Sequence, residues 1–271
     1  MLKDITLGQF FPGNSLLHKT DARFKVLILI AFLTATIAAK SLWSFVMITA
    51  VTLALVLLSK ISPSTVLKNL KGLIFILIFT GILNIFFHKG EHLLLHWEFI
   101  KIYREGLIYA GFMMLRLICL VTGSFVVLTY TTSPLDMTDA LEKLLAPLKL
   151  IKVPVRDFAM MMTIALRFIP TLIEETDKIM SAQKARGADM ESGGIVKRAK
   201  ALIPILIPLF VSAFRRADEL ADAMECRCYN GGKGKTRMKQ MKSRFADWLF
   251  LAVMTGIAVA TFFINAYGVR V

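Results

Sequence analysis

Five apolar runs, each about long enough to cross a lipid bilayer, constrain most strongly what this chain can fold into. They cover residues 24–39, 42–59, 72–88, 106–130 and 246–267. A membrane-spanning helix needs about 20 mostly apolar residues, and a soluble domain of 271 residues would not carry several such runs. The hydrophobic share of 56% agrees with this assignment. The sequence therefore predicts an all-α integral membrane protein with about five transmembrane helices.

The Lys and Arg residues are divided unevenly between the two sides of these runs. Four lie in residues 1–25, three in 60–71 and twenty in 131–247. The opposite side holds five, which are Lys40, Lys89, Lys101, Arg104 and Arg270. Because Lys and Arg accumulate in cytoplasmic loops, we expect the N-terminus and segment 131–247 in the cytoplasm and the C-terminus outside. The predicted location is the cell (plasma) membrane, crossed several times.

The net charge of +14 bears on the partners of the chain. Basic segments are attracted to anionic lipid headgroups, and they also occur in proteins that bind nucleic acid. No nucleic-acid motif is visible in the sequence. We therefore expect the lipid bilayer to be a partner and nucleic acid not to be one.

Composition divides the chain into three parts. Residues 1–130 form an N-terminal membrane domain of four spans, and residues 246–271 form a C-terminal transmembrane helix. Residues 131–245 are predicted to hold three amphipathic helices on the cytoplasmic side. The first of these is short, Leu135–Leu148, and follows Ser133-Pro134, which is typical of a helix start.

The other two amphipathic helices are long and share one design. The first runs from Val155 to Met180 and the second from Ile195 to Met224, with apolar residues at three- and four-residue steps. Each is nearly all apolar in its first half and amphipathic in its second half. Each then reaches an arginine between small residues, in the sequences Ala185-Arg186-Gly187 and Cys226-Arg227-Cys228.

Two interpretations of Arg186 and Arg227 are open. A cation in the last turn of a helix is favoured by the helix dipole, and Gly187 is an ordinary residue after a helix end. The alternative is a docking role, because an arginine fork suits an acidic groove on a partner. The occurrence of two such arginines after two similar helices favours docking.

Several other patterns match known sites only in part. The segment from Gly231 to Thr236 ends like a nucleotide-binding loop, but Tyr229 stands where that motif needs glycine. Cys226 and Cys228 are too few ligands for a structural zinc site. Asp218 and Asp222 match half of an aspartate-rich diphosphate site, and the solvated face of a helix explains them. The sequence predicts no catalytic residue and no cofactor.

Residues 88–105 are expected to form a mixed-charge loop with some helix. His88, His92 and His96 lie four residues apart there, which is metal-ligand spacing on a helix. Gly90 interrupts the segment and few carboxylates support the set, so no metal site is predicted. Arg116, inside the fourth span, is expected to face protein or water, with Asn84 as one candidate partner.

Taken together, these motifs resemble the T component of energy-coupling factor (ECF) transporters over essentially the whole chain. Gly13-Asn14-Ser15 with His18, Asp21, Arg23 and Lys25 is similar to the opening of that family, and Ser133-Pro134-Leu135 with Asp139-Ala140-Leu141 is similar to its first coupling helix. Ala185-Arg186-Gly187 matches its first arginine motif. The second motif is often Ala-Arg-Gly as well, whereas Cys226-Arg227-Cys228 keeps only the arginine.

The resemblance implies a subunit that is not an enzyme and that imports a vitamin or another micronutrient together with its partners. Segment 131–245 would be a cytoplasmic coupling module. Arg186 and Arg227, with their neighbours Ala185, Gly187, Cys226 and Cys228, would dock on two ATP-binding cassette ATPases, which would bind the ATP. The apolar halves of the long helices would contact a substrate-binding membrane subunit, the S component, through residues that include Met161, Phe168, Leu206 and Phe210.

Two other functions remain as alternatives. A permease that lines its own solute pathway would carry polar residues along several spans, and spans one, two and five carry few. An integral-membrane enzyme would need a converging set of Asp, Glu, His or Cys residues near one membrane face. The sequence does not identify the transported vitamin or ion, and it does not say how many S components the chain serves.

Overall fold

The computed structural model describes residues 11, 13–87, 93–97, 100–188, 194–229, 231, 241 and 243–267. The chain separates into two compact units. Residues 8–140 and 241–271 form the first, which we call the membrane unit. Residues 141–240 belong to the second, which we call the amphipathic unit.

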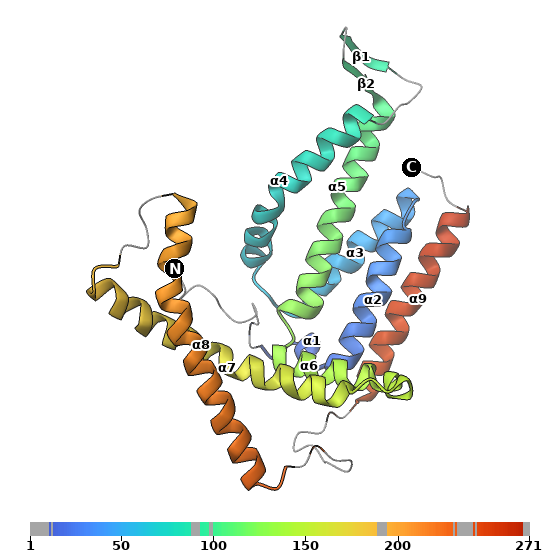
Figure 1. The fold of residues 1–271 in the computed structure, drawn as a ribbon. Helices are drawn as coiled ribbons and strands as arrows, with labels where there is room; N and C mark the ends of the chain where they lie inside the picture. The colour runs from blue at the N-terminus through green and yellow to red at the C-terminus, as the bar shows by residue number, and fades with distance from the viewer. Residues whose placement is uncertain are drawn as a thin grey trace. The chain divides into compact units, whose positions relative to one another are not determined.

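Long helices lie side by side in the membrane unit, with α4 along α5 and α2 along α9 (Figure 1). They are α2 (Ala22–Ala38), α3 (Leu42–Ser59), α4 (Pro63–Phe87), α5 (Arg104–Ser124) and α9 (Phe245–Tyr267), and a short helix, α1 (Leu16–Lys19), precedes α2. α5 continues into a short π-helix, η2 (Phe125–Thr129).

Four helical segments among the described residues are long and apolar enough to cross a membrane. They are Leu42–Ser59, Pro63–Phe87, Arg104–Thr129 and Phe245–Ala266, which correspond to four of the five predicted runs. The remaining run forms α2, whose 17 residues rise about 26 Å against a hydrocarbon core of about 30 Å. α4 begins earlier than the predicted run at residue 72, because Pro63 suits the first turn of a helix.

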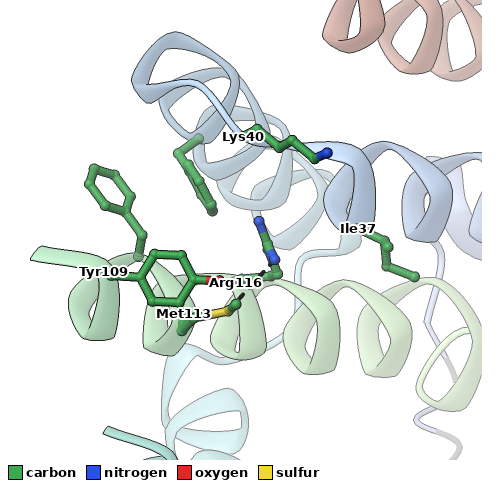
Figure 2. Close-up of a pocket in the computed structure, with 7 residues that line it drawn as sticks. Ile37, Lys40, Tyr109, Met113 and Arg116 are labelled. Carbon is green, nitrogen blue, oxygen red and sulfur yellow. Dashed lines mark hydrogen bonds between the residues drawn. The ribbon is translucent and has the colours of Figure 1, made fainter. Parts of the chain in front are cut away.

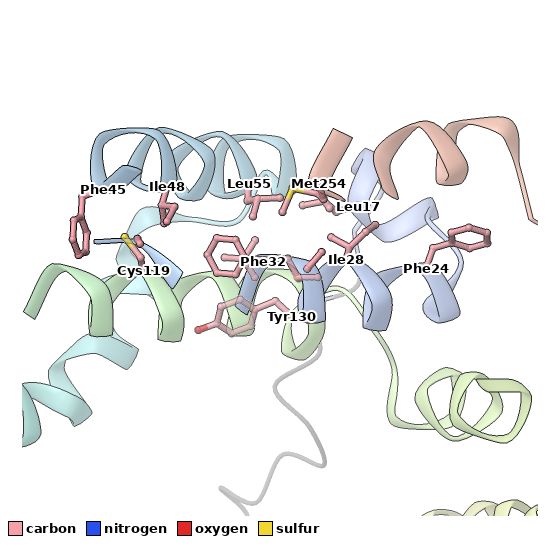
Figure 3. Packing of buried hydrophobic residues seen from close by; sticks show 14 residues of the cluster. Leu17, Phe24, Ile28, Phe32, Phe45, Ile48, Leu55, Cys119, Tyr130 and Met254 are labelled. Carbon is pink, nitrogen blue, oxygen red and sulfur yellow. The ribbon is translucent and has the colours of Figure 1, made fainter. Parts of the chain in front are cut away.

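A cluster of buried side chains joins α2, α3, α9 and the end of α5 (Figure 3). Its members include Ile28, Phe32, Ile48, Leu55, Val126, Tyr130 and Met254, each of which is at most 3% exposed. Gly123 is essential to this packing, since a Cβ atom at that position would lie 2.2 Å from Cε1 of Phe32. The close approach of α5 to α2 therefore depends on the absence of a side chain at residue 123.

Asn265 of α9 stabilises the short turn between α2 and α3. Its Oδ1 accepts hydrogen bonds from the backbone N–H of Lys40 (3.0 Å), the backbone N–H of Ser41 (3.1 Å) and the hydroxyl of Ser44 (2.9 Å). Its Nδ2 donates to the carbonyl oxygen of Ala38 at 2.7 Å. One amide side chain thus satisfies groups at the ends of two helices, where a bilayer would supply little water.

The segment predicted as a partly helical loop at 88–105 contains a β-hairpin instead. β1 (Leu93–Trp97) pairs antiparallel with β2 (Ile100–Tyr103), with Trp97 opposite Ile100. Residues 93–97 and 100–103 hold no helix, whereas Arg104 and Glu105 already belong to α5. β2 carries two β-branched residues, Ile100 and Ile102, and each strand ends on an aromatic residue, Trp97 or Tyr103; such residues favour extended backbone.

α7 (Val155–Ala185) and α8 (Ile195–Cys226) dominate the amphipathic unit, and both predicted long helices are confirmed. The first amphipathic helix, α6 (Pro134–Leu144), follows Ser133, whose Oγ accepts from the backbone N–H of Asp136 at 3.1 Å. It ends earlier than the predicted Leu148. Pro147 interrupts the α-helical hydrogen bonds, and a 3₁₀ segment, η3 (Ala146–Ile151), follows.

Candidate functional site

Arg186 stands at the C-cap of α7, where backbone groups alone close the helix end. The next residue, Gly187, has a left-handed conformation with φ +82°. Its N–H donates to the carbonyl oxygen of Lys184 at 3.0 Å, and the N–H of Ala188 donates to that of Gln183 at 3.0 Å. These two bonds form a Schellman motif.

Arg227 stands at the corresponding position of α8. Cys228 takes the left-handed conformation at φ +58° and donates to the carbonyl oxygen of Glu225 at 2.8 Å. Tyr229 donates to that of Met224 at 3.0 Å. The two helix ends therefore match bond for bond, although cysteine replaces glycine at a position where a side chain costs about 1–2 kcal/mol.

The side chains of both arginines are free to bind a partner. Arg186 and Arg227 are exposed, and neither forms an ion pair within the described residues. Because backbone N–H groups donate the hydrogen bonds that form both caps, neither guanidinium is part of its cap. As helix caps, the arginines would act only through the attraction between their charge and the helix dipole, which stabilises a helix by about 0.3–1 kcal/mol.

Three polar contacts join α7 to α8 in antiparallel order. Tyr229 donates to the sulfur of Met160 at 2.9 Å, Arg216 pairs with Glu175 at 3.2 Å, and the Nε2 of Gln183 donates to the carbonyl oxygen of Pro204 at 3.4 Å. That carbonyl has no helical donor, because Pro208 lacks the N–H that would reach it. The contacts connect α7 and α8 at three points along the two helices.

Comparison with the sequences of known proteins shows the family of this chain. Residues 13–239 match the family CbiQ, described as cobalt transport protein. The chain belongs to the CbiQ family. A relative from Clostridium kluyveri is 52% identical over 92% of each chain, and one from Ruminiclostridium cellulolyticum is 52% identical over 96% of this chain and 95% of its own. Both are named energy-coupling factor transporter transmembrane protein.

A relative with the same name from Lactococcus lactis subsp. cremoris is 45% identical over 92% of this CbiQ-family chain and 94% of its own. The predicted resemblance to the transmembrane component of ECF transporters is therefore confirmed. With its apolar helices, the chain is a membrane-integral transport protein.

The residues predicted to contact a substrate-binding subunit lie largely uncovered in this CbiQ-family chain. Met161, Leu206 and Phe210 are 56%, 46% and 61% exposed, and Phe168 is half-buried. The first two-thirds of α8 add further exposed apolar side chains, which are Leu202, Ile203, Ile207, Val211 and Phe214. A surface of this kind usually marks a contact with protein or membrane. Its predicted contact with an S component stays a prediction.

The N-terminal residues that carry the family resemblance have structural contacts at the start of α2. The carboxylate of Asp21 accepts from the backbone N–H of Arg23 and pairs with its guanidinium at 2.7 Å. Lys25 is buried and donates to the carbonyl oxygen of Thr131 at 2.7 Å. The Nε2 of His18 lies 2.8 Å from the carbonyl oxygen of Phe11, which requires a proton on Nε2. This motif therefore organises the start of α2.

Asn84, which the sequence offered as one candidate partner of Arg116, bonds within its own helix instead. Its Nδ2 donates to Thr80 of its own helix at 2.8 Å. Arg116 instead donates to the carbonyl oxygen of Ala39 and lies over the ring of Phe45, 5.2 Å from the centroid. Ala39 follows the last residue of α2, so its carbonyl accepts no hydrogen bond within the helix. The sequence pattern does not show that this carbonyl lies near Arg116.

The remaining candidate residues form no site in the part of the chain that the structure describes. Asp218 and Asp222 are exposed on α8, and Cys226 and Cys228 are exposed free thiols. Within the described residues no group of three His, Cys, Asp or Glu side chains is placed to hold a metal. His88, His92 and residues 232–236 lie outside the described residues, and His96 lies in β1.

Proposed function

We propose that this chain is the T component of an ECF-type uptake transporter, joining two cytoplasmic ATPases to a substrate-binding membrane subunit. The observation that carries the proposal is the pair of matched helix ends at Arg186 and Arg227. Each presents an exposed guanidinium on a rigid backbone motif, at the end of a different helix. Two helix ends that expose an arginine in the same way suit two equivalent partner subunits.

Each arginine would dock in an acidic groove on one ATPase. A guanidinium forms two parallel hydrogen bonds with a carboxylate, and a lysine does not reproduce this geometry. Removing one partner of a buried charge pair costs about 2–5 kcal/mol, which is roughly 30- to several-thousand-fold in affinity. Two docking points on one chain add avidity, so the loss of one leaves a weakened complex.

The exposed apolar surface of α7 and α8 would carry the substrate-binding subunit. Closure of the ATPases on ATP would move the two helices, and the apolar surface would transmit this movement to the bound subunit. In this role the chain hydrolyses no ATP and needs no cofactor of its own. The cargo would be a vitamin or another micronutrient, held by the S component.

The amphipathic unit and the N-terminus are proposed to lie in the cytoplasm, as the distribution of Lys and Arg predicts. Cysteine accessibility labelling at positions 95 and 237 tests this orientation. Position 237 is expected to react only from the cytoplasm and position 95 only from outside. Labelling of both from the same side would contradict the topology.

The docking role is tested by co-purification of the ATPases and by uptake for Arg186→Glu, Arg227→Glu and the double variant. We expect each single variant to weaken the complex and the double variant to release both ATPases, with a loss of transport in all three. Arg215→Glu is the matched control, since Arg215 is exposed on α8 and away from its end. A double variant that retains both ATPases at the wild-type level would contradict the docking role. The arginines would then only stabilise their helix ends through the helix dipole.

A further inference from the structure

Arg116 places a positive charge within α5 without a carboxylate partner among the described residues. Its Nη2 donates to the carbonyl oxygen of Ala39 and its Nη1 lies 3.6 Å from the sulfur of Met113. The Nε is buried and has no acceptor. Because α5 is apolar enough to cross a membrane, a charge along it is costly unless a counter-charge or polar groups reach it. The carbonyl and the Phe45 ring offset only part of that cost.

A cavity of about 250 Å³ opens beside the Arg116 guanidinium (Figure 2). A second cation, Lys40, lines the cavity from the turn that follows α2, and none of the described residues lining it is acidic. Tyr109 and Phe112 of α5 add aromatic walls. Two cations without an anion predict an anionic ligand.

The surroundings of the cavity indicate the source of that anion. It lies where α2 ends and α3 begins, and therefore at the end of two adjacent apolar helices. Ile37 lines it with 62% of its surface exposed, so apolar surface continues from the cavity along α2. Aromatic side chains beside cations are typical of the boundary between hydrocarbon and headgroups.

We propose that this cavity binds the phosphate of an anionic phospholipid, with the acyl chains lying along α2 outside it. The guanidinium of Arg116 and the ammonium of Lys40 neutralise the phosphate, which in turn removes the uncompensated charge within α5. The volume equals about eight water molecules at 30 Å³ each, which is room for a headgroup and not for acyl chains. A zwitterionic headgroup carries a cation of its own, which the Arg116 guanidinium and the Lys40 ammonium would repel.

Native mass spectrometry of the purified full-length chain tests this site. Phosphatidylglycerol, phosphatidylcholine of the same acyl chains and soluble glycerol 3-phosphate are titrated separately. We expect the wild-type chain to retain one phosphatidylglycerol at least about tenfold more tightly than phosphatidylcholine, and glycerol 3-phosphate more weakly than either. Equal retention of the two lipids would overturn the proposal. Retention of glycerol 3-phosphate as tight as that of phosphatidylglycerol would also overturn it, in favour of a soluble phosphate.

Three variants locate the binding. Lys40→Gln is expected to weaken phosphatidylglycerol binding about fivefold, as one Lys beside a lipid phosphate contributes about 1 kcal/mol. Arg116→Gln is expected to weaken it more than tenfold. Arg104→Gln is the matched control, because Arg104 is exposed at the start of the same helix and does not line the cavity; it is expected to stay within twofold of wild type.

Lys40→Gln keeps the test decisive if Arg116→Gln fails to fold. The Lys40 side chain is exposed, and Lys40 donates to Asn265 through its backbone N–H, which the substitution keeps. Equal weakening by Lys40→Gln and Arg104→Gln would show a general charge effect and would overturn the site.

Discussion

The two units bury their apolar side chains to very different extents. In α2 of the membrane unit, eight of 17 residues are buried, whereas in α7 of the amphipathic unit Val155 and Ala159 are the buried residues of 31. On α8, Ile205 is 4% exposed, while Phe210 and Phe214 are 61% and 67% exposed. The membrane unit has a core within this chain, and the amphipathic unit leaves most of its apolar surface for another molecule.

Exposed apolar surface has a different meaning in each unit, and charge distinguishes the two cases. α4 buries Gly81 among its 25 residues, but its only charges, Lys68 and Lys71, lie near its start, so lipid can surround the rest. α7 and α8 carry exposed charges such as Glu174, Lys178 and Asp218 along their second halves. Helices with one aqueous face and one uncovered apolar face need a protein or membrane-interface partner.

The largest effect is expected from a side chain placed inside the core of the membrane unit. Gly123→Val would force at least one carbon to within 2.2 Å of the Phe32 ring and separate α5 from α2. We expect a loss of folded protein, or destabilisation of about 3 kcal/mol or more, measured by thermal unfolding in detergent. Gly111→Val is the control on the same helix, since a Cβ there meets nothing within 4 Å. Equal behaviour of the two variants would contradict the tight packing.

A charge on the exposed surface of the amphipathic unit should instead leave the chain folded and weaken assembly. Phe210→Asp removes a large apolar side chain and adds a charge that a partner would have to bury. We expect the S component to bind at least 10- to 100-fold more weakly, corresponding to about 1.5–3 kcal/mol, while the ATPases stay bound. Phe168→Asp should act in the same direction. Asp218→Asn is the control on the aqueous face, and unchanged retention of the S component by Phe210→Asp would refute this role.

Removal of the Asn265 amide tests how far the membrane unit depends on one polar contact. Asn265→Leu leaves the N–H groups of Lys40 and Ser41 without their acceptor, and each unsatisfied group costs about 1–3 kcal/mol when buried. We expect a clear fall in unfolding temperature. Asn265→Asp should lose less, because it keeps the acceptor oxygen and loses the donor to Ala38. A Leu variant as stable as wild type would mean that water satisfies this turn.

The smallest expected effect separates the two cysteines beside Arg227. Cys228 has a left-handed backbone, so Cys228→Gly should stabilise the end of α8 by up to about 1 kcal/mol. Cys226 lies within the helix, so Cys226→Gly should destabilise it by up to about 1 kcal/mol. Unfolding temperatures measured under reducing conditions should therefore move in opposite directions. Shifts of the same sign would contradict the Schellman geometry.

Periodicity and charge were enough to predict the two long helices and four of the apolar segments, because those signals repeat along one stretch of chain. Features that depend on distant residues were missed. Asn265 caps a turn more than 200 residues earlier, and Arg116 binds the carbonyl of Ala39; neither pairing leaves a local pattern. In the sequence, only the two arginines indicated that the two helix ends match. Cysteine rarely adopts the left-handed backbone conformation, so the sequence did not show that Cys228 takes the place of Gly187.

The central claim is that the ends of α7 and α8 dock two ATPases, and photo-crosslinking in the assembled complex tests it most directly. A photoreactive phenylalanine analogue is introduced at position 186, at position 227 or, as control, at position 215, and the crosslinked partner is identified by mass spectrometry. We predict that positions 186 and 227 crosslink to ATPase subunits, and that position 215 crosslinks to them far less. Crosslinks from 186 and 227 to the membrane subunit alone, or no crosslinks beyond those of position 215, would contradict the account.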